Sequence, residues 1–390
     1  MDRRAFLKSA MGTATLGALG QTSTVAWAAA APSGTYRNLV VLIELKGGND
    51  GLNTVVPYAD PTYYALRPKL AIARDSVVQL SDAAGLHPAL APLLPFWRER
   101  ELAVLFGVGY PAPNLSHFRS IEIWDTASPS DTYLQEGWLS RALAAVPAPK
   151  SFAADGVIIG SNDLGPLAGG GTRAVALNNT DQFLRQSRLA SAHGEPRNKA
   201  FQHILKVEDD ILQAASHLDA HHAFAVEFRE GAFGNAIRTA CQVIANPAGV
   251  AIVRVTLSGF DTHGGQPATQ ARLLGELAQG IVTLKSALTE LGRWNDTLIL
   301  TYAEFGRRPK ENLSNGTDHG TASVHFALGG RVKGGFYGEQ PSLDRLSGDG
   351  NTGYAIDFRR VYATVLDEWW GVSSQDVLGG RFATVPFVTA

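Results

Sequence analysis

TLILTYAEFGRRPKENLSNGTDHGTASVHFALGG, residues 297–330, is the stretch that decides the fold. The apolar run Leu298–Leu300 is typical of a buried strand, and the chain soon reaches Glu304, with two arginines close behind it. A polar loop then leads to Asp318 and His319, and a second apolar segment follows. In open α/β sheets, ligands bind beyond the carboxyl ends of the strands. Acids and a histidine released at such ends therefore suit a metal-assisted active site.

Three other buried strands are predicted, at residues 38–45, 102–108 and 250–257, from continuous apolar and β-branched runs. Between residues 266 and 291, apolar side chains recur at helical spacing, and this predicts a helix that leads to the strand at Leu298. Strand, helix and strand in this order form a βαβ unit, which favours a parallel sheet. The fold class that follows is α/β.

Each of these strands also ends in a polar loop. Asp50 follows the first strand, Ser116 follows the second, and Asp261 and His263 follow the third. Residues two apart in extended backbone point to the same side, so Asp261 and His263 can bind one ion. A carboxylate and a neutral imidazole suit Zn²⁺, Mn²⁺ or Fe²⁺. Ordinary alternatives stay open: a turn at Asp50, a helix N-cap at Ser116, and a hydrogen-bonded loop pair at Asp261 and His263.

The bulk composition excludes several classes of protein. The chain has 390 residues, 45% of them hydrophobic and 18% charged, which is typical of a globular protein with a large core. Its formal net charge of −2 gives no basic field to hold nucleic acid or anionic lipid. The single cysteine, Cys241, excludes an intramolecular disulfide and a multi-cysteine metal site. We expect no transmembrane anchor in the mature chain, because no apolar run is long enough.

Residues 1–30 are predicted to be a targeting segment. They contain the twin arginines of Arg3–Lys8, a weakly apolar stretch at Ala10–Gly20, and an Ala-x-Ala cleavage site at Ala26–Ala28. These parts resemble a bacterial Tat signal, and the alternative is an arginine pair that occurs by chance. The Tat translocon would then be a partner during export, and the mature protein would be periplasmic or secreted.

We expect the remaining chain, residues 31–390, to form a single domain. Residues 180–245 are predicted to contain a run of helices, and we interpret them as an insertion that would cap the site. Asp357–Trp370 is predicted to be a C-terminal helix whose aromatic face packs in the core.

Five short motifs occur in order along the chain: GGNDGLNT at 47–54, LSHF at 115–118, FDTHG at 260–264, EFGR at 304–307 and GTDHG at 316–320. As a set, and with the twin-arginine leader, they resemble a bacterial exported family known as domain of unknown function 1501. That family is similar to the alkaline phosphatase and sulfatase superfamily. The resemblance covers nearly the whole mature chain. It implies an alkaline-phosphatase-like, doubly wound α/β fold, with a mostly parallel central sheet, helices on both faces and a metal centre at the strand ends.

The resemblance also assigns roles to residues. It implies Ser116 as nucleophile and a metal centre formed from Asp50, Asp261, His263, Glu304, Asp318 and His319. The first Asp and His of the superfamily pattern are usually four apart, whereas Asp261 and His263 are two apart. Glu304 and Phe305 stand where an Asp-His pair is usual, which removes one ligand. The implied cofactor is one firmly bound Zn, Mn or Fe ion, with a weaker second site.

Three functions are compatible with these residues. The leading hypothesis is an exported metal-dependent hydrolase of small anionic phosphate or sulfate esters, in which Ser116 attacks and Arg307 or Arg308 binds the ester oxygens. Those arginines are otherwise an ordinary surface pair. His117 either supports the metal ligands from outside or acts as a leaving-group acid, and the more common role for such a residue is that of a helix-turn histidine. The second hypothesis is a non-catalytic protein of the same fold that binds a metal or a cell-surface ligand. A Ser–His–Asp esterase ranks last, because the chain contains no Gly-x-Ser-x-Gly elbow.

Overall fold

A computed structural model describes residues 36–177 and 222–389 of the chain. The strands of its central sheet are β1 Leu39–Lys46, β5 Leu102–Gly109, β6 Ala154–Ile159, β7 Ala174–Leu177, β8 Val250–Ser258, β9 Thr297–Tyr302, β12 Ser323–Leu328, β13 Gly335–Tyr337 and β14 Ile356–Asp357. Their order is β13-β5-β12-β9-β1-β8-β6-β7, with β14 also beside β5. Strand β12 runs antiparallel to β5 and β9, and the other pairs are parallel.

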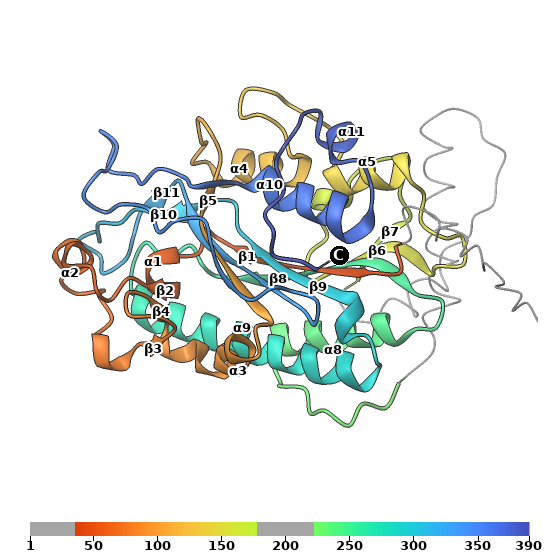
Figure 1. Cartoon of the computed structure of the whole chain (residues 1–390), viewed down its shortest axis with the longest axis horizontal. Helices are drawn as coiled ribbons and strands as arrows, with labels where there is room; N and C mark the ends of the chain where they lie inside the picture. The colour runs from red at the N-terminus through yellow and green to blue at the C-terminus, as the bar shows by residue number, and fades with distance from the viewer. Residues whose placement is uncertain (1–35, 178–221, 390) are drawn as a thin grey trace, which may run out of the picture. The chain divides into compact units, whose positions relative to one another are not determined.

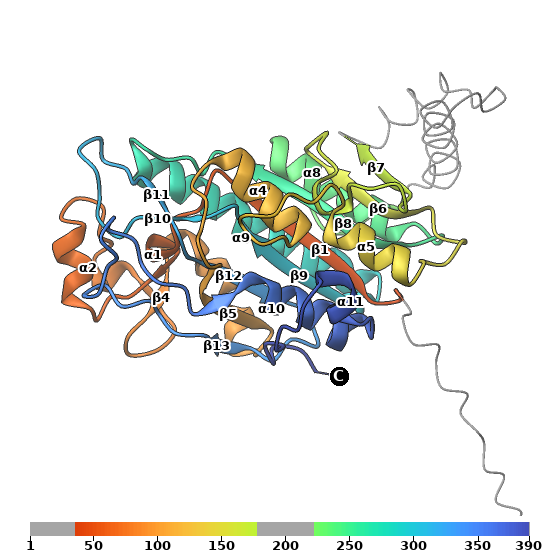
Figure 2. The same ribbon diagram turned by 90° about the horizontal axis from the view of Figure 1, so that it is seen from above.

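Helices cover both faces of this sheet. The helices of the described residues are α1 Gly51–Thr54, α2 Pro61–Leu66, α3 Leu94–Arg98, α4 His117–Thr126, α5 Trp138–Ala145, α8 Ala232–Ala245, α9 Gln266–Glu290, α10 Phe358–Ala363 and α11 Ser374–Leu378, and a π-helical segment, Thr364–Trp370, extends α10. Figure 1 shows α3, α8 and α9 on one face, and Figure 2 shows α4, α5, α10 and α11 on the other. The predicted α/β fold with a doubly wound, mostly parallel sheet is therefore confirmed.

The sequence of β1 explains why it lies at the centre. Val41, Ile43 and Leu45 pack in one hydrophobic core, with α8 and α9, whereas Val40 and Leu42 pack in the other. Successive side chains of a strand point to opposite faces, so a continuous apolar run supplies both cores at once. The predicted strands near residues 102 and 250 and the helix between residues 266 and 291 are present as β5, β8 and α9.

The segment predicted as a helical cap, residues 180–245, falls into two parts. Residues 178–221 lie outside the described residues. Helix α8 is described, and its apolar residues are buried against β8, β6 and α9, so this part of the segment covers the sheet. No helix within residues 36–177 and 222–389 is both long and apolar enough to cross a membrane.

The antiparallel direction of β12 shapes the loop that precedes it. Because β9 and β12 run in opposite directions, residues 303–322 leave and re-enter the sheet at one end, where the carboxyl ends of β1 and β8 also lie. Within this loop, β10 Gly306–Arg307 pairs antiparallel with β11 His319–Gly320. A separate small sheet consists of β2 Val55–Val56, β3 Val78–Gln79 and β4 Gly85–Leu86.

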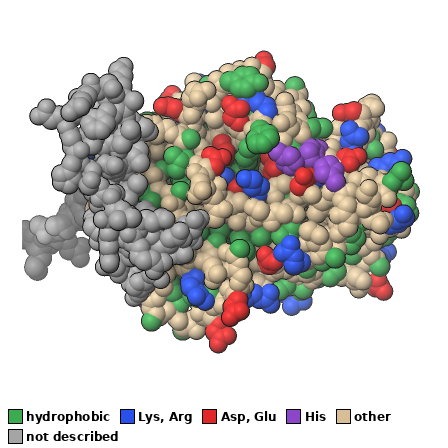
Figure 3. All heavy atoms as spheres, turned by 180° about the vertical axis from the view of Figure 1, so that it is seen from behind, with side chains coloured by type: hydrophobic (Ala, Val, Ile, Leu, Met, Phe, Trp, Pro, Cys, Tyr) green, Lys and Arg blue, Asp and Glu red, His purple; other side chains and the backbone are tan. Residues whose placement is uncertain are grey.

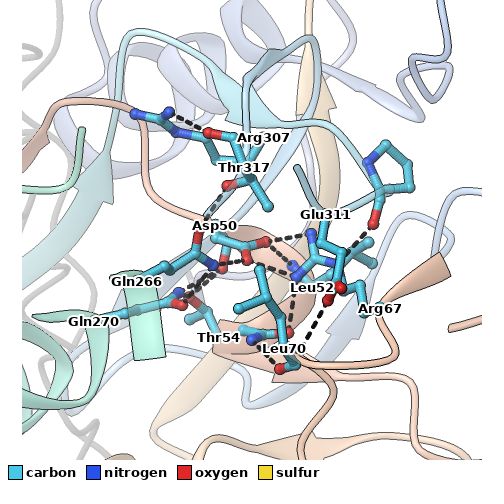
Figure 4. Close-up of polar contacts among 12 residues, drawn as sticks. Asp50, Leu52, Thr54, Arg67, Leu70, Gln266, Gln270, Arg307, Glu311 and Thr317 are labelled. Atoms are coloured by element: carbon cyan, nitrogen blue, oxygen red, sulfur yellow. Dashed lines mark hydrogen bonds and ion pairs between the residues drawn. The ribbon is translucent and has the colours of Figure 1, made fainter. Parts of the chain in front are cut away.

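A buried polar cluster fastens this loop to the rest of the domain (Figure 4). Arg67 Nη1 lies 2.6 Å from Asp50 Oδ2, and both side chains are fully buried. The guanidinium of Arg67 also donates to the carbonyls of Arg308, at 3.0 Å, and Pro309, at 2.7 Å. Gln266, at the start of α9, donates to the same carboxylate of Asp50. The cluster therefore joins the ends of β1 and β8 to the 303–322 loop.

Removal of one member of this pair should destabilise the protein. We expect Arg67→Met to lower the free energy of unfolding by about 3–5 kcal/mol, because it leaves the Asp50 carboxylate buried and unpaired. Combining it with Asp50→Asn should restore part of that loss. The control is Arg272→Met in the exposed Arg272–Glu276 pair, which should change stability by roughly 0.5 kcal/mol or less. Urea unfolding measures all three, and equal losses for Arg67→Met and Arg272→Met would contradict this role.

Candidate metal centre

Loops at the carboxyl end of the sheet bring histidine and aspartate side chains together. Strand β5 leads to His117, β8 leads to Asp261 and His263, and the 303–322 loop carries His319. Ligand atoms of His117, Asp261 and His319 all lie within 4.8 Å of one another. Figure 3 shows histidine side chains gathered beside acidic ones on one face of the molecule. The structure thus brings together three of the predicted site residues and adds His117.

His117 is the first residue of α4, and a hydrogen bond to Glu304 orients its ring. Its Nδ1 lies 2.8 Å from Glu304 Oε1, and a carboxylate only accepts, so Nδ1 carries the hydrogen. This bond raises the pKa of His117 above its usual value, against the opposing effect of burial. The other nitrogen, Nε2, lies 3.5 Å from Asp261 Oδ2. It is buried and has no hydrogen-bond partner among the described residues.

His319 repeats this arrangement from the 303–322 loop. Its Nδ1 donates to the carbonyl of Leu115 over 2.8 Å, so in the neutral ring Nε2 is left with a lone pair. That Nε2 lies 3.3 Å from Asp261 Oδ1 and 3.0 Å from His263 Nε2. Burial lowers the pKa of His319, which favours the neutral ring.

His263 is the third imidazole and the most exposed. Its Nδ1 lies 3.3 Å from Asp318 Oδ1, and its Nε2 lies 3.1 Å from Asp261 Oδ1. Asn312 Nδ2 donates to the same oxygen of Asp318 and to the backbone carbonyl of His263. Gly316 packs so closely on His263 that an added Cβ would lie 2.3 Å from its backbone carbonyl carbon. Asp318 therefore orients His263 instead of belonging to the converging group.

Asp261 is the acid on which the three rings converge. Burial alone would raise its pKa, but the hydrogen bond and the charge of Arg307 outweigh this and hold the pKa below the usual value. Arg307 Nη2 lies 2.6 Å from Asp261 Oδ1. The carboxylate is therefore anionic, yet 46% of its side chain is exposed, so it remains open to a ligand.

Arg307 does not occupy the place expected of a substrate-binding residue. Its side chain is fully buried, and its donors are directed to Asp261 and to four backbone carbonyls, those of Gly47, Gly48, Phe260 and Thr317. Its position in β10 points it under the loops and not outward. The expectation that Arg307 binds ester oxygens is corrected accordingly: it is a positioning residue.

Glu304 and Asp50 were expected as metal ligands, and the structure gives both of them other partners. Glu304 is buried and accepts from the backbone N–H of Gly47 at 2.9 Å as well as from His117. The Asp50 carboxylate accepts hydrogen bonds from the side chains of Arg67 and Gln266, and it caps α1 by accepting one from the backbone N–H of Leu52. Neither carboxylate belongs to the group that converges on Asp261.

Ser116 lies directly before His117, at the N-cap position of α4. Ser116 is exposed, and its hydroxyl makes no capping hydrogen bond to the helix. A serine in this position usually accepts a bond from the first turn. The hydroxyl is therefore free to act on a ligand, although the structure itself gives it no contact to the converging group.

Phe305 and His117 are the site residues that sequence reasoning undervalued. The buried ring of Phe305 lies under two imidazoles, 4.8 Å from His117 and 4.4 Å from His319 between centroids. The signal for His117 was available in the motif LSHF, because the residue after Ser116 leaves the same strand end. Asp261 and His263 were selected because they follow the end of a buried strand, and the same criterion also selects His117.

Sequence comparison identifies the family. The family model described as "Protein of unknown function (DUF1501)" matches residues 104–379, more than half of the chain. The chain belongs to the DUF1501 family. A search of curated proteins finds no match.

Solved structures similar to this DUF1501 protein were also found. Ps i-CgsB in complex with k-i-k-neocarrahexaose is 11% identical over 88% of this chain and 72% of its own, with a TM-score of 0.40. The phosphonate monoester hydrolase of Agrobacterium radiobacter is 12% identical over 88% and 78%, with a TM-score of 0.36. Alkaline phosphatase from the Antarctic bacterium TAB5 is 10% identical over 78% and 95%, also with a TM-score of 0.36.

The bond between Glu304 and His117 yields a pH prediction for the metal-free protein. Glu304→Gln should lower the pKa of His117 toward its ordinary value of about 6.5, because the carboxylate that raises it is gone. A folded-state pKa above the unfolded one stabilises the protein at low pH, and this stabilisation is lost as the pH rises through the folded value. The stability difference between wild type and variant should shrink over that window. NMR titration of the imidazole with a chelator present measures the pKa, and an unchanged value would exclude this pairing.

Proposed function

We propose that His117, Asp261, His263 and His319 bind one divalent transition-metal ion. The observation that carries this proposal is a shared orientation: each imidazole engages an oxygen with Nδ1 and turns Nε2 toward the Asp261 carboxylate. Metal-binding histidines usually hold an acceptor with the second nitrogen in this way. The Nε2 lone pairs and the negatively charged Asp261 carboxylate repel one another unless a proton or a metal cation lies between them. Imidazoles with one carboxylate suit Zn²⁺, Mn²⁺ or Fe²⁺.

The proposal is limited to one ion. The resemblance implies a weaker second site formed by Asp50, Glu304 and Ser116, and its two carboxylates are buried and occupied by protein donors. Breaking the Asp50–Arg67 pair to release a ligand would leave a buried guanidinium unpaired, which is costly.

With this centre, the function we propose is hydrolysis of small anionic phosphate or sulfate esters. A bound metal ion would act as a Lewis acid and favour the deprotonated form of a nearby hydroxyl. Ser116, beside His117 and free of a capping bond, is the proposed nucleophile. Arg308 replaces Arg307 as the proposed anion-binding residue. Its side chain is half-buried, and its buried Nε has no hydrogen-bond partner in the described part of the chain.

We also propose that the reaction takes place outside the cytoplasm. The support for this is the twin-arginine pattern within residues 1–30, which would direct export through the Tat translocon to the periplasm or beyond.

A second candidate function is metal binding without catalysis. This function is favoured because Asp50 and Glu304 bind other protein groups, which leaves ligands for one ion. A centre with one ion has less positive charge with which to stabilise a transferring phosphoryl or sulfuryl group. In this case the protein would bind a metal or a cell-surface ligand and would not turn over esters.

Metal binding itself is tested first. Purified wild type should bind close to one equivalent of Zn²⁺ or Mn²⁺, and the ion should raise the melting temperature because it binds the folded state alone. Glu304→Gln should weaken binding roughly 10–100-fold, as outer-shell changes usually do, and His319→Ala should weaken it more. Titration calorimetry and elemental analysis measure this. His222→Ala, at an exposed histidine paired with Glu290, is the matched control and should bind like wild type. Equal affinities for His319→Ala and His222→Ala would exclude the centre.

Ser116→Ala distinguishes the two candidate functions. For a hydrolase, it should lower kcat on phosphate or sulfate esters by about 10³-fold or more, because the reaction loses its nucleophile, while metal stoichiometry stays at the wild-type value. Ser130→Ala, at a half-buried serine in the loop after α4, is the control. If loaded wild type turns over neither class of ester, the binding function is the one that remains.

A further inference from the structure

Four side chains converge on the candidate metal centre, but a metal site that acts on a substrate usually keeps one position open. Catalytic zinc sites usually have three protein ligands, and the fourth position takes water or substrate. His117, Asp261 and His319 have ligand atoms that all lie within 4.8 Å of one another and could form such a set of three. The groups that support each imidazole show which of the ligands is held least firmly.

The imidazoles of His117 and His319 are packed against a buried aromatic ring. The ring centroid of Phe305 lies 4.8 Å from that of His117 and 4.4 Å from that of His319, and the two imidazole centroids lie 4.5 Å apart. Phe305 is itself packed so closely on Gly48 that an added Cβ there would lie 2.5 Å from its ring carbons. Neither imidazole can turn away without disturbing these packed rings.

His263 lies outside this packed set of rings. Among the described residues, the only ring that it packs on is that of His319, with 4.8 Å between the centroids. Its side chain is also the most exposed of the three imidazoles. Because few atoms touch the ring of His263, little packing is lost when it turns toward solvent.

The groups that accept from Nδ1 differ in the same way. Glu304, the partner of His117, is only 3% exposed, so a turn of His117 would leave a buried carboxylate with one donor fewer, which is costly. Asp318, the partner of His263, is 52% exposed and lies 3.3 Å away, whereas His117 and His319 each have a 2.8 Å contact. Water can take the place of His263 beside Asp318, so the release of this imidazole leaves no buried group unpaired.

The backbone of His263 is nevertheless fixed. Asn312 donates to its carbonyl over 2.9 Å, and an added Cβ on Gly316 would lie 2.3 Å from its carbonyl carbon. The preceding carbonyl, that of Thr262, accepts from the backbone N–H of Thr317 over 3.1 Å. Movement of the imidazole therefore needs only rotation about side-chain bonds, and the loop stays in place.

We propose that His263 is a displaceable ligand, which completes the metal centre in the resting protein and gives up its place to an oxygen of the phosphate or sulfate ester. This inference rests on the proposed function, and it places the entry of the substrate on the exposed side of the centre. With Asp261 as the one carboxylate, a divalent ion keeps a positive charge, so an anionic oxygen is favoured over a neutral nitrogen. The exchange transfers no proton and no electron.

Competition between His263 and the anion predicts an unusual effect of mutation. A binding site that is occupied by a competing group for part of the time has a lower apparent affinity. His263→Ala, loaded with Zn²⁺, should therefore bind inorganic phosphate about tenfold more tightly than wild type, whereas loss of an ordinary binding residue would weaken it. His222→Ala, at an exposed histidine paired with Glu290, is the control and should bind phosphate like wild type. Titration calorimetry measures this, and unchanged or weaker phosphate binding by His263→Ala overturns the inference.

X-ray absorption spectroscopy tests the exchange itself, because it reports the number of imidazoles around the zinc ion. The full chain loaded with Zn²⁺ should show three imidazoles, those of His117, His263 and His319, and one fewer after inorganic phosphate is added. His263→Ala should show the lower number in both conditions. It should also keep one equivalent of zinc and lose less than about tenfold in affinity, which is less than the loss expected for Glu304→Gln.

The outcomes separate this inference from the proposed function. A number of imidazoles that phosphate leaves unchanged in wild type overturns the displacement of His263, and the metal centre remains. Wild type that already has the lower number without phosphate also overturns it, because His263 would then not be a ligand. If wild type binds no Zn²⁺ at all, the proposed function is contradicted and this inference falls with it.

Discussion

The buried guanidinium of Arg307 is the constraint on which the candidate metal centre depends. A cation removed from water is tolerated only where its donors are satisfied, and here the acceptors are carbonyls at the ends of β1 and β8 and in the 303–322 loop. The loops must therefore close around it before the domain is stable. The same guanidinium also binds Asp261, so one group fixes both the loops and the anion that they surround. A lysine has three donors and no planar fork, and could not replace it.

Each imidazole of the centre is fixed by a different kind of support. His117 is held by a buried carboxylate, His319 by the carbonyl of Leu115, and His263 by Asp318 at the surface. The His263 side chain is the most exposed of the three, at 46%, against 33% for His117 and 21% for His319, so the side of the centre nearest His263 is open to solvent. A site that presents preset nitrogens toward one open side can accept an ion and a ligand with little rearrangement.

The sequence was sufficient for the sheet and for three of the four residues of the proposed centre. Continuous apolar runs predicted β1, β8 and β9, because strands buried on both faces cannot alternate with polar residues. Strand-end reasoning likewise located Asp261. It could not separate Asp261 from Asp50, since both are acids that follow buried strands beside glycines. The difference comes from Arg67, a tertiary partner that no local pattern reveals. The inward direction of Arg307 was hidden for the same reason, because it follows from the pairing of β10 with β11.

The return of the 303–322 loop to the sheet also bears on how this family can diverge. Its two stems are fixed in register by β9 and β12, and the short β10–β11 ladder closes it above them. Residues added near Leu313 would enlarge a loop that is already closed, at a small entropic cost and without moving either strand. The loop tip is therefore a place where insertions can accumulate while His319 stays in position. Relatives could therefore differ in the length of this loop tip without rebuilding the centre.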